Sequence, residues 1–146
     1  MTPDKRFLDQ VLDGSIVLPC AMSTNPLAQL LDVEFLEASR DGNVLISMRL
    51  SRDYLQAGAA LQGGSLVMIA DFAMAFSALC TIAADRNVAS VSLSTSFLRG
   101  GEPGRLFAAG TIARSGRRII HAEAVVAPDR TMSNPVITAS SSLIVI

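Results

Sequence analysis

The feature that most constrains the fold is a long apolar segment, residues 63 to about 84, in the middle of the chain. It contains no proline and is rich in alanine, leucine and methionine, so we expect a single helix. Apolar residues occur on nearly all of its sides, which predicts burial nearly all round. The length would also suit a membrane span, but Asp71 near the centre makes insertion costly, by about 3 kcal/mol. We therefore expect no membrane partner.

Alternation of apolar and polar residues predicts strands on both sides of this helix. Two strands precede it, at residues 33–39 and 43–50, and the Asp-Gly pair between them is typical of a hairpin turn. Four strands follow it, at residues 88–98, 105–114, 117–127 and 135–146, and short turns make the last three antiparallel neighbours. On the first of these four, one face should carry Ala89, Val91, Leu93, Thr95 and Phe97, and the other Ser90, Ser92, Ser94 and Ser96.

Two short helices are expected before the first strand. Thr2 can cap one that begins at Pro3, and either Asn25 or Thr24 can cap one that begins at Pro26. The order of elements predicts an α+β fold, in which a curved antiparallel sheet wraps around the long helix. We expect a single domain over residues 1–146, with a helical extension over about residues 1–31.

Composition narrows the class of function. Half of the residues are hydrophobic and 17% are charged, which excludes disorder and suggests that association hides part of the apolar surface. The net charge of −1 and the absence of tryptophan argue against a nucleic-acid partner. The N-terminus has no apolar signal segment, so we expect a cytoplasmic protein.

The cysteines and the single histidine show no metal-ligand or disulfide pattern, so no metal is expected. Cys20 and Cys80 are far apart in the sequence, and Cys80 fits a small buried hydrophobe. His121 lies in a strand pattern between Ile119 and Glu123, which predicts a partly exposed side chain. A zinc site or a Ser-His-Asp triad is therefore not expected.

Asp71 is the feature of the long helix that needs an explanation. Its neighbours at three and four residues on either side are all uncharged, so no local cation neutralises it. A carboxylate in this setting must be paired, protonated or beside water. Either Asp71 is functional, or it pairs with an arginine from elsewhere, such as Arg49, Arg99 or Arg118; residue type and spacing leave both readings open.

Gly63 and Gly64 stand where the helix begins. The first N–H groups of a helix have no internal partner, and glycine leaves them open to a ligand. They could bind an oxyanion or a phosphate, or the pair could simply permit a tight turn. Gly64 and Asp71 are two helical turns apart and so share a face.

Several motifs carry a family resemblance. The sequence reads Gln62-Gly63-Gly64, then SLVMIA, then Asp71, followed downstream by SFLRG and ARSGRRIIHAEAVV and preceded by NPLAQLLDVEFLEASRDGNVLISMRL. From about Thr24 to the C-terminus the chain resembles the hotdog-fold thioesterases of the phenylacetate-degradation (PaaI-like) group. That group carries His-Gly-Gly, six residues and then Asp on its central helix. Gln62 here replaces the histidine and can donate a hydrogen bond but cannot carry a proton.

The resemblance implies roles for individual residues. Asp71 would be the general base or nucleophile in thioester hydrolysis, and the N–H groups of Gly63 and Gly64 would polarise the thioester carbonyl. Ser90, or less directly Ser92, would help to hold the water. In this group the acid comes from one subunit and the glycines from the other, so a homodimer or homotetramer is implied.

The resemblance also implies an acyl-CoA substrate and no separate cofactor, since coenzyme A is part of the substrate. Gln56 and Gln62 would line the site, and an apolar slot beside Met68 and Phe72 would hold the acyl chain. The arginines that could grip the phosphates of coenzyme A are Arg99, Arg117 and Arg118, with Arg114 beside them.

Three alternatives remain at this stage. The chain could bind acyl-CoA without hydrolysing it, with Gln62 as the mark of lost activity. It could be a hotdog hydratase or dehydratase, although that chemistry usually needs a histidine beside an acid. It could also be a purely structural oligomer.

Overall fold

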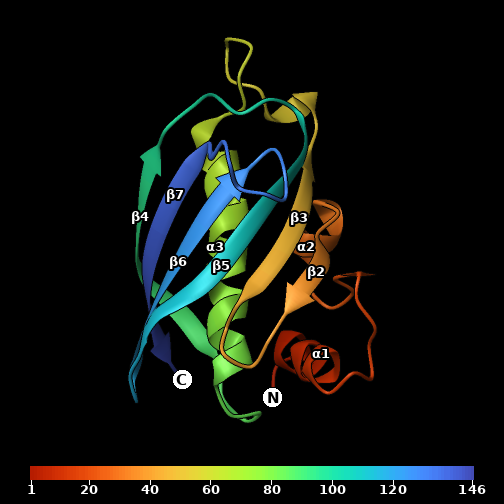
Figure 1. Ribbon diagram of the computed structural model, residues 1–146, viewed down its shortest axis with the longest axis vertical. Helices are drawn as coiled ribbons and strands as arrows, with labels where there is room; N and C mark the ends of the chain where they lie inside the picture. Colours follow the sequence, from red (N-terminus) through yellow and green to blue (C-terminus); the bar gives the residue numbers. More distant parts are fainter.

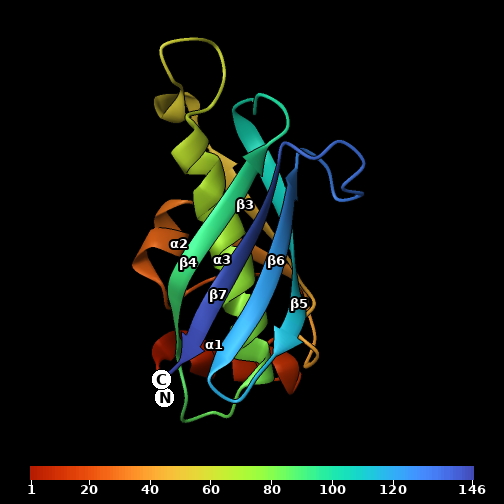
Figure 2. The same cartoon turned by 90° about the vertical axis from the view of Figure 1, so that its left-hand side faces the viewer.

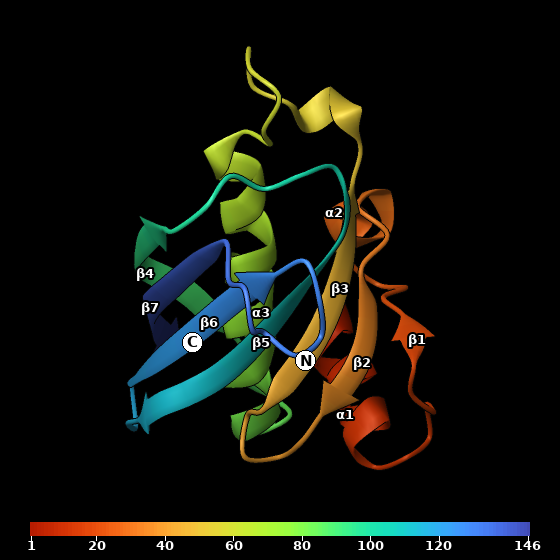
Figure 3. The ribbon, with the colours of Figure 1, turned by 45° about the horizontal axis from the view of Figure 1, so that its top comes forward.

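The chain folds into one seven-stranded antiparallel sheet that curves around a central helix (Figures 1 and 3). The computed structural model describes residues 1–146. In chain order the elements are α1 (Pro3–Leu12), β1 (Cys20–Ala21), α2 (Pro26–Leu30), β2 (Glu34–Ala38), β3 (Val44–Leu50), a 3₁₀ turn (Arg52–Tyr54), α3 (Gly63–Thr81), β4 (Val88–Phe97), β5 (Gly104–Ser115), β6 (Ile119–Ala127) and β7 (Ile137–Val145). The strand order is β1-β2-β3-β5-β6-β7-β4, which confirms the predicted architecture.

Local sequence signals place most of the element boundaries. The side chains of Thr2 and Asn25 accept hydrogen bonds from the N–H groups of Lys5 and Ala28. The predicted cap at Thr2 is confirmed, and of the two candidates for the second helix the structure selects Asn25. Strand β1 and the 3₁₀ turn were not predicted. Helix α3 begins at the predicted Gly63 but ends three residues early, because Ile82 is already extended.

The N-terminal elements belong to the same core as the sheet. Phe7 of α1 packs against Phe35 of β2, with ring centroids 5.7 Å apart, and both join one hydrophobic cluster of 32 buried residues. Within the predicted extension over residues 1–31, α1 therefore covers the core beside the end of α3, whereas α2 lies beside β2 and β3 (Figure 1).

Small residues on the concave face of the sheet let α3 lie close to the strands. A Cβ at Gly110 of β5 would stand 2.5 Å from the carbonyl oxygen of Ala73 and 2.4 Å from the hydroxyl of Ser77. Ala108, Ala122 and Ala124 are buried on the same face. The helix is thus held where larger side chains would push it away.

One side of α3 is only half covered, so the expectation of burial nearly all round is wrong. The partly or fully exposed residues at helical spacing are Gly64, Val67, Met68, Asp71, Phe72 and Ala75, here called the open stripe. The curved sheet covers only part of the helix circumference, and the stripe lies beyond its reach. Helix α3 is long and apolar enough to cross a membrane, but the core helices of soluble proteins are often equally long and apolar. In this structure 61% of the apolar part of α3 is buried inside the protein.

Strand β4 forms one edge of the sheet, and no strand pairs with its outer side (Figure 2). It has ten residues, none of which is charged or a proline. Charged residues and prolines are what usually prevent an edge strand from pairing with another strand. At this edge Val91 and Phe97 are 63% and 57% exposed, and the following Leu98 is 50% exposed. This edge is therefore suited to pairing with another strand.

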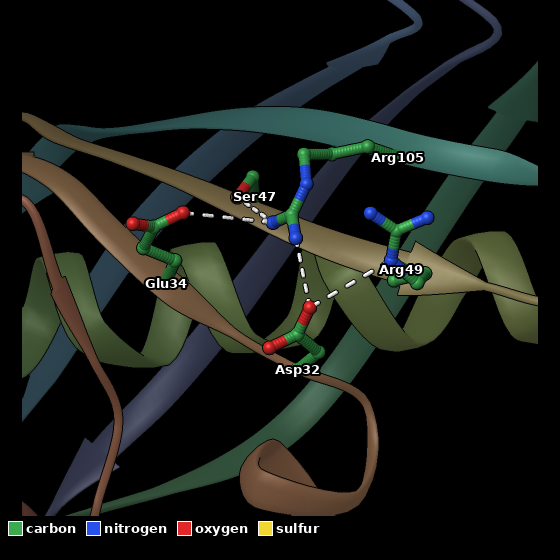
Figure 4. A network of polar contacts seen from close by, with 5 residues as sticks. All are labelled: Asp32, Glu34, Ser47, Arg49 and Arg105. Atoms are coloured by element: carbon green, nitrogen blue, oxygen red, sulfur yellow. Dashed lines mark hydrogen bonds and ion pairs between the residues drawn. The ribbon is translucent and has the colours of Figure 1, made fainter.

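The outer face of the sheet carries a network of ion pairs (Figure 4). The Arg105 guanidinium donates to the Ser47 hydroxyl at 2.6 Å and to the Asp32 carboxylate at 2.7 Å. It also lies 3.6 Å from the Glu34 carboxylate, and Arg49 lies 3.7 Å from Asp32. Because the network ties the α2–β2 connection to β3 and β5, its role is structural.

Candidate active site

Asp71 lies in the middle of the open stripe. Its side chain is half-buried and forms no ion pair. Arg49 pairs with Asp32 on the opposite face of the sheet, and Arg99 donates to the carbonyl of Pro135 at 2.8 Å. Arg118 lies in the β5–β6 turn, and no hydrogen bond or ion pair joins its side chain to Asp71. Within the chain, Asp71 is therefore not the structural partner of any of these arginines.

The hydroxyl of Ser90 on β4 donates a hydrogen bond to Asp71 Oδ1 at 3.2 Å. This contact depends on a β-bulge at Val91. Ser90 pairs with Leu143 of β7, whereas Ser92 pairs with the next residue along, Ser142. Directly paired residues share a face, so Ser90 faces the helix and Ser92 faces outward.

The bulge corrects the predicted faces of β4. Leu93, Thr95 and Phe97 share the helix-facing side, as expected, because they pair with Ser141, Ala139 and Ile137. Ser90 was expected on the other face but joins them, and Ala89 turns outward. An extra residue in one strand reverses every side chain before it, and strict alternation cannot foresee it.

The start of α3 offers free backbone donors. Gln62 occupies the N-cap position with no side-chain cap, and Gly63 and Gly64 precede the first hydrogen bond inside the helix. A Cβ at Gly63 would stand 3.0 Å from the ring of Phe97, whereas nothing lies within 4 Å of one at Gly64. The helix dipole adds positive potential here, so a developing oxyanion would be stabilised.

Within one chain these donors and the acid are too far apart to act on one carbonyl. Gly64 and Asp71 are seven residues apart, which is about 10 Å along a helix. A reacting carbon must lie about 3 Å from both kinds of group. The open stripe thus holds the two halves of a site that one chain does not close.

Two hollows flank the start of α3. The Tyr54 hollow, of ≈ 470 Å³, is lined by Asp53, Tyr54, Leu55, Gln62, Gly64, Ser65 and Met68. The Arg99 hollow, of ≈ 350 Å³, is lined by Gln56, Ala60, Leu61, Gly63, Leu66, Phe97, Leu98, Arg99, Gly100 and Gly101. The loop of residues 55–61, which projects beyond the sheet in Figure 1, contributes to both.

The structure gathers some predicted site residues and separates others. Met68 and Gln62 line the Tyr54 hollow, whereas Gln56 and Arg99 line the other hollow. Phe72 lies on the open stripe and stacks on Phe76, with ring centroids 5.4 Å apart.

Arg117 and Arg118 do not join this group within the chain. They lie in the β5–β6 turn, next to the start of β4, whereas Gly63 meets Phe97 at the end of β4. Tyr54 and Leu55 were missed by sequence reasoning. The available signal was that the only tyrosine of the chain lies eight residues before the Gln-Gly-Gly motif.

The remaining candidate groups lie away from this site. His121 is exposed on the outer face, as expected, with Nδ1 3.1 Å from the Ser142 hydroxyl. Cys80 is buried, as expected, and burial raises the pKa of its thiol to about 12. No group of three or more His, Cys, Asp or Glu side chains is placed to hold a metal ion.

A curved antiparallel sheet wrapped around one long helix, with an acid on the helix and paired glycines at its start, defines the hotdog class of folds. Among solved structures the chain is similar to a phenylacetic acid degradation-related protein, described as a thioesterase, from Ralstonia eutropha, with a TM-score of 0.79 and 20% identity over 94% of this chain and 98% of that one. It is also similar to the PaaI protein of E. coli, with a TM-score of 0.74 and 18% identity over 84% and 85% of the two chains. At such identities the likeness shows the fold.

A match within the sequence itself agrees with this fold. Residues 60–131, from the start of α3 through β6, match the model of the thioesterase superfamily. A search of curated proteins found no match. The sequence match and the shared fold bear out the resemblance to hotdog thioesterases and the prediction of a thioester hydrolase.

Proposed function

We propose that the chain hydrolyses acyl-CoA thioesters with a small to medium acyl or aryl group, using Asp71 and the start of α3. One observation carries the proposal: Asp71 is unpaired with any cation, hydrogen-bonded only to Ser90, and placed on an open stripe that ends at free N–H groups. A half-buried carboxylate beside a hydroxyl suits general base or nucleophilic catalysis.

In the general-base route, Asp71 takes a proton from water as the oxygen attacks the thioester carbon. The carbonyl oxygen becomes an oxyanion and accepts hydrogen bonds from the N–H groups of Gly63 and Gly64. The C–S bond then breaks, and the leaving thiolate takes the proton from Asp71. In the nucleophilic route Asp71 attacks the carbon directly, and water cleaves the resulting anhydride.

Ser90 and Gln62 would assist this chemistry. Ser90 holds one carboxylate oxygen of Asp71 and leaves the other free for water or substrate. The side chain of Gln62 is exposed and forms no hydrogen bond within the chain, while its backbone carbonyl accepts from Ser65. Its amide could therefore donate to the substrate.

We further propose that the site is shared between two copies in a homodimer. The separation of about 10 Å between Gly64 and Asp71 requires a second chain to bring an acid to each pair of glycines. Two antiparallel α3 helices related by a two-fold axis would place Asp71 of one beside Gly64 of the other, twice. The uncharged β4 edge is the surface that would extend the sheet across the dimer.

The test is hydrolysis of short, medium, long and aryl acyl-CoAs by the wild type and by Asp71→Asn. We expect kcat/KM to fall about a hundredfold or more in Asp71→Asn. Asp85→Asn, in the exposed turn after α3, is the matched control and should retain activity. Equal activity of Asp71→Asn and wild type would contradict the assigned role.

The competing proposal is a module that binds acyl-CoA without hydrolysis. It is favoured by one residue, Gln62, which cannot carry the proton that a histidine could. Binding of acyl-CoA by the folded wild type with no turnover of any panel member would establish this alternative instead.

A further inference from the structure

We infer that the two hollows divide the substrate between them: the acyl group enters the Tyr54 hollow, and the pantetheine arm and phosphates leave through the Arg99 hollow. Tyr54 then determines acyl specificity. This inference rests on the proposed acyl-CoA substrate and states how that substrate is oriented in the site.

The two adjacent glycines line different hollows. Gly64 lines the Tyr54 hollow and Gly63 lines the Arg99 hollow. A thioester whose carbonyl oxygen meets these adjacent N–H groups has one substituent on either side of them. The acyl carbon chain and the sulfur arm must therefore enter different hollows.

The two hollows differ in charge, and this difference determines which arm of the substrate enters which hollow. Asp53 is the only charged residue of the Tyr54 hollow, and Arg99 is the only charged residue of the other. The phosphates of coenzyme A are repelled by Asp53 and attracted by Arg99. Arg99 uses one N–H on the carbonyl of Pro135, which holds the guanidinium in place and leaves other donors free.

The side chains that line the Tyr54 hollow suit an acyl group. Tyr54, Leu55 and Met68 give the Tyr54 hollow apolar surfaces, and a methionine beside an aromatic ring adapts to acyl groups of different shape. The hydroxyl of Tyr54 forms no hydrogen bond within the chain, so the ring is held by packing. At ≈ 470 Å³ this is also the larger hollow.

Tyr54→Ala tests the acyl side. We expect the ratio of kcat/KM for decanoyl-CoA over acetyl-CoA to rise about tenfold, because removal of the ring enlarges the hollow. Inhibition by free coenzyme A, which has no acyl group, should stay within about twofold of wild type. Tyr54→Phe keeps the ring and should restore the wild-type chain-length preference.

Arg99→Gln tests the other side. The inhibition constant of free coenzyme A should rise about tenfold at low salt, with the preference among acyl chains unchanged. Arg86→Gln removes the same charge and is the control, because Arg86 is exposed in the loop beyond the far end of α3 and forms no ion pair. It should leave the inhibition constant of free coenzyme A unchanged.

The converse pattern overturns the inference: Tyr54→Ala weakens coenzyme A inhibition, or Arg99→Gln alters chain preference. If the wild type hydrolyses nothing, the proposed activity fails, and the same variants are compared by calorimetric binding of free coenzyme A and of decanoyl-CoA. Loss of affinity for both ligands in Tyr54→Ala would then refute the division on its own.

Discussion

Mixing two inactive variants tests the shared site most directly. One partner is Asp71→Asn, which lacks the acid. The other is Gly64→Val, whose added side chain stands over the free N–H groups. No atom lies within 4 Å of a Cβ at Gly64, so this variant should fold, whereas a Cβ at Gly63 would press on Phe97 at 3.0 Å. Each variant alone should be nearly inactive.

The expected recovery follows from the geometry. If each site takes its acid from one chain and its glycines from the other, a mixed dimer holds one intact site and one doubly damaged site. Random assortment makes about half of the dimers mixed, so about a quarter of wild-type activity should return. If acid and glycines of one chain acted together, every site would stay damaged.

The assay is steady-state thioester hydrolysis after co-expression of the two chains with different affinity tags. Tandem purification isolates the mixed dimer, which should show about half of wild-type activity per dimer. Mixed dimers with no more activity than either parent would refute the two-chain site. The separation of about 10 Å between Gly64 and Asp71 would then need another explanation.

Three further predictions concern positioning and stability. Ser90→Ala should lower kcat by about tenfold with little change in KM, because it removes the 3.2 Å bond to Asp71; an unchanged kcat would argue against this role. Gly110→Ala should lower the free energy of unfolding by about 1–3 kcal/mol in urea titrations, since its Cβ meets backbone at 2.5 Å, while Gly58→Ala in open space should stay within about 0.5 kcal/mol. Burial raises the Cys80 pKa from 9.0 to about 12, so the folded state retains a proton that the unfolded state loses above pH 9. Between pH 8 and pH 10 the wild type should therefore lose about 1.4 kcal/mol more stability than Cys80→Ala, and equal losses would contradict this.

Sequence periodicity determined the elements and their class. Alternation placed the predicted strands to within a residue or two, capping residues placed the helix starts at Pro3 and Pro26, and the glycine pair marked the start at Gly63. These signals are local, because they depend on residues a few positions apart. Asp71 was visible for the same reason, as a lone charge in an apolar helix with no cation at helical spacing.

The tertiary structure decided which side chains meet. Ser90 reaches Asp71 only because β4 gains a residue against β7, a register set by hydrogen bonds to a strand some fifty residues away. The open stripe exists because the sheet covers only part of α3, and the Tyr54 hollow forms where a turn and a helix start approach each other. The register of a strand and the part of the helix that a curved sheet covers depend on how all the strands pair, and residues a few positions apart do not determine them. For that reason the sequence pointed to the acid and the glycines, and only the fold revealed that one chain keeps them apart.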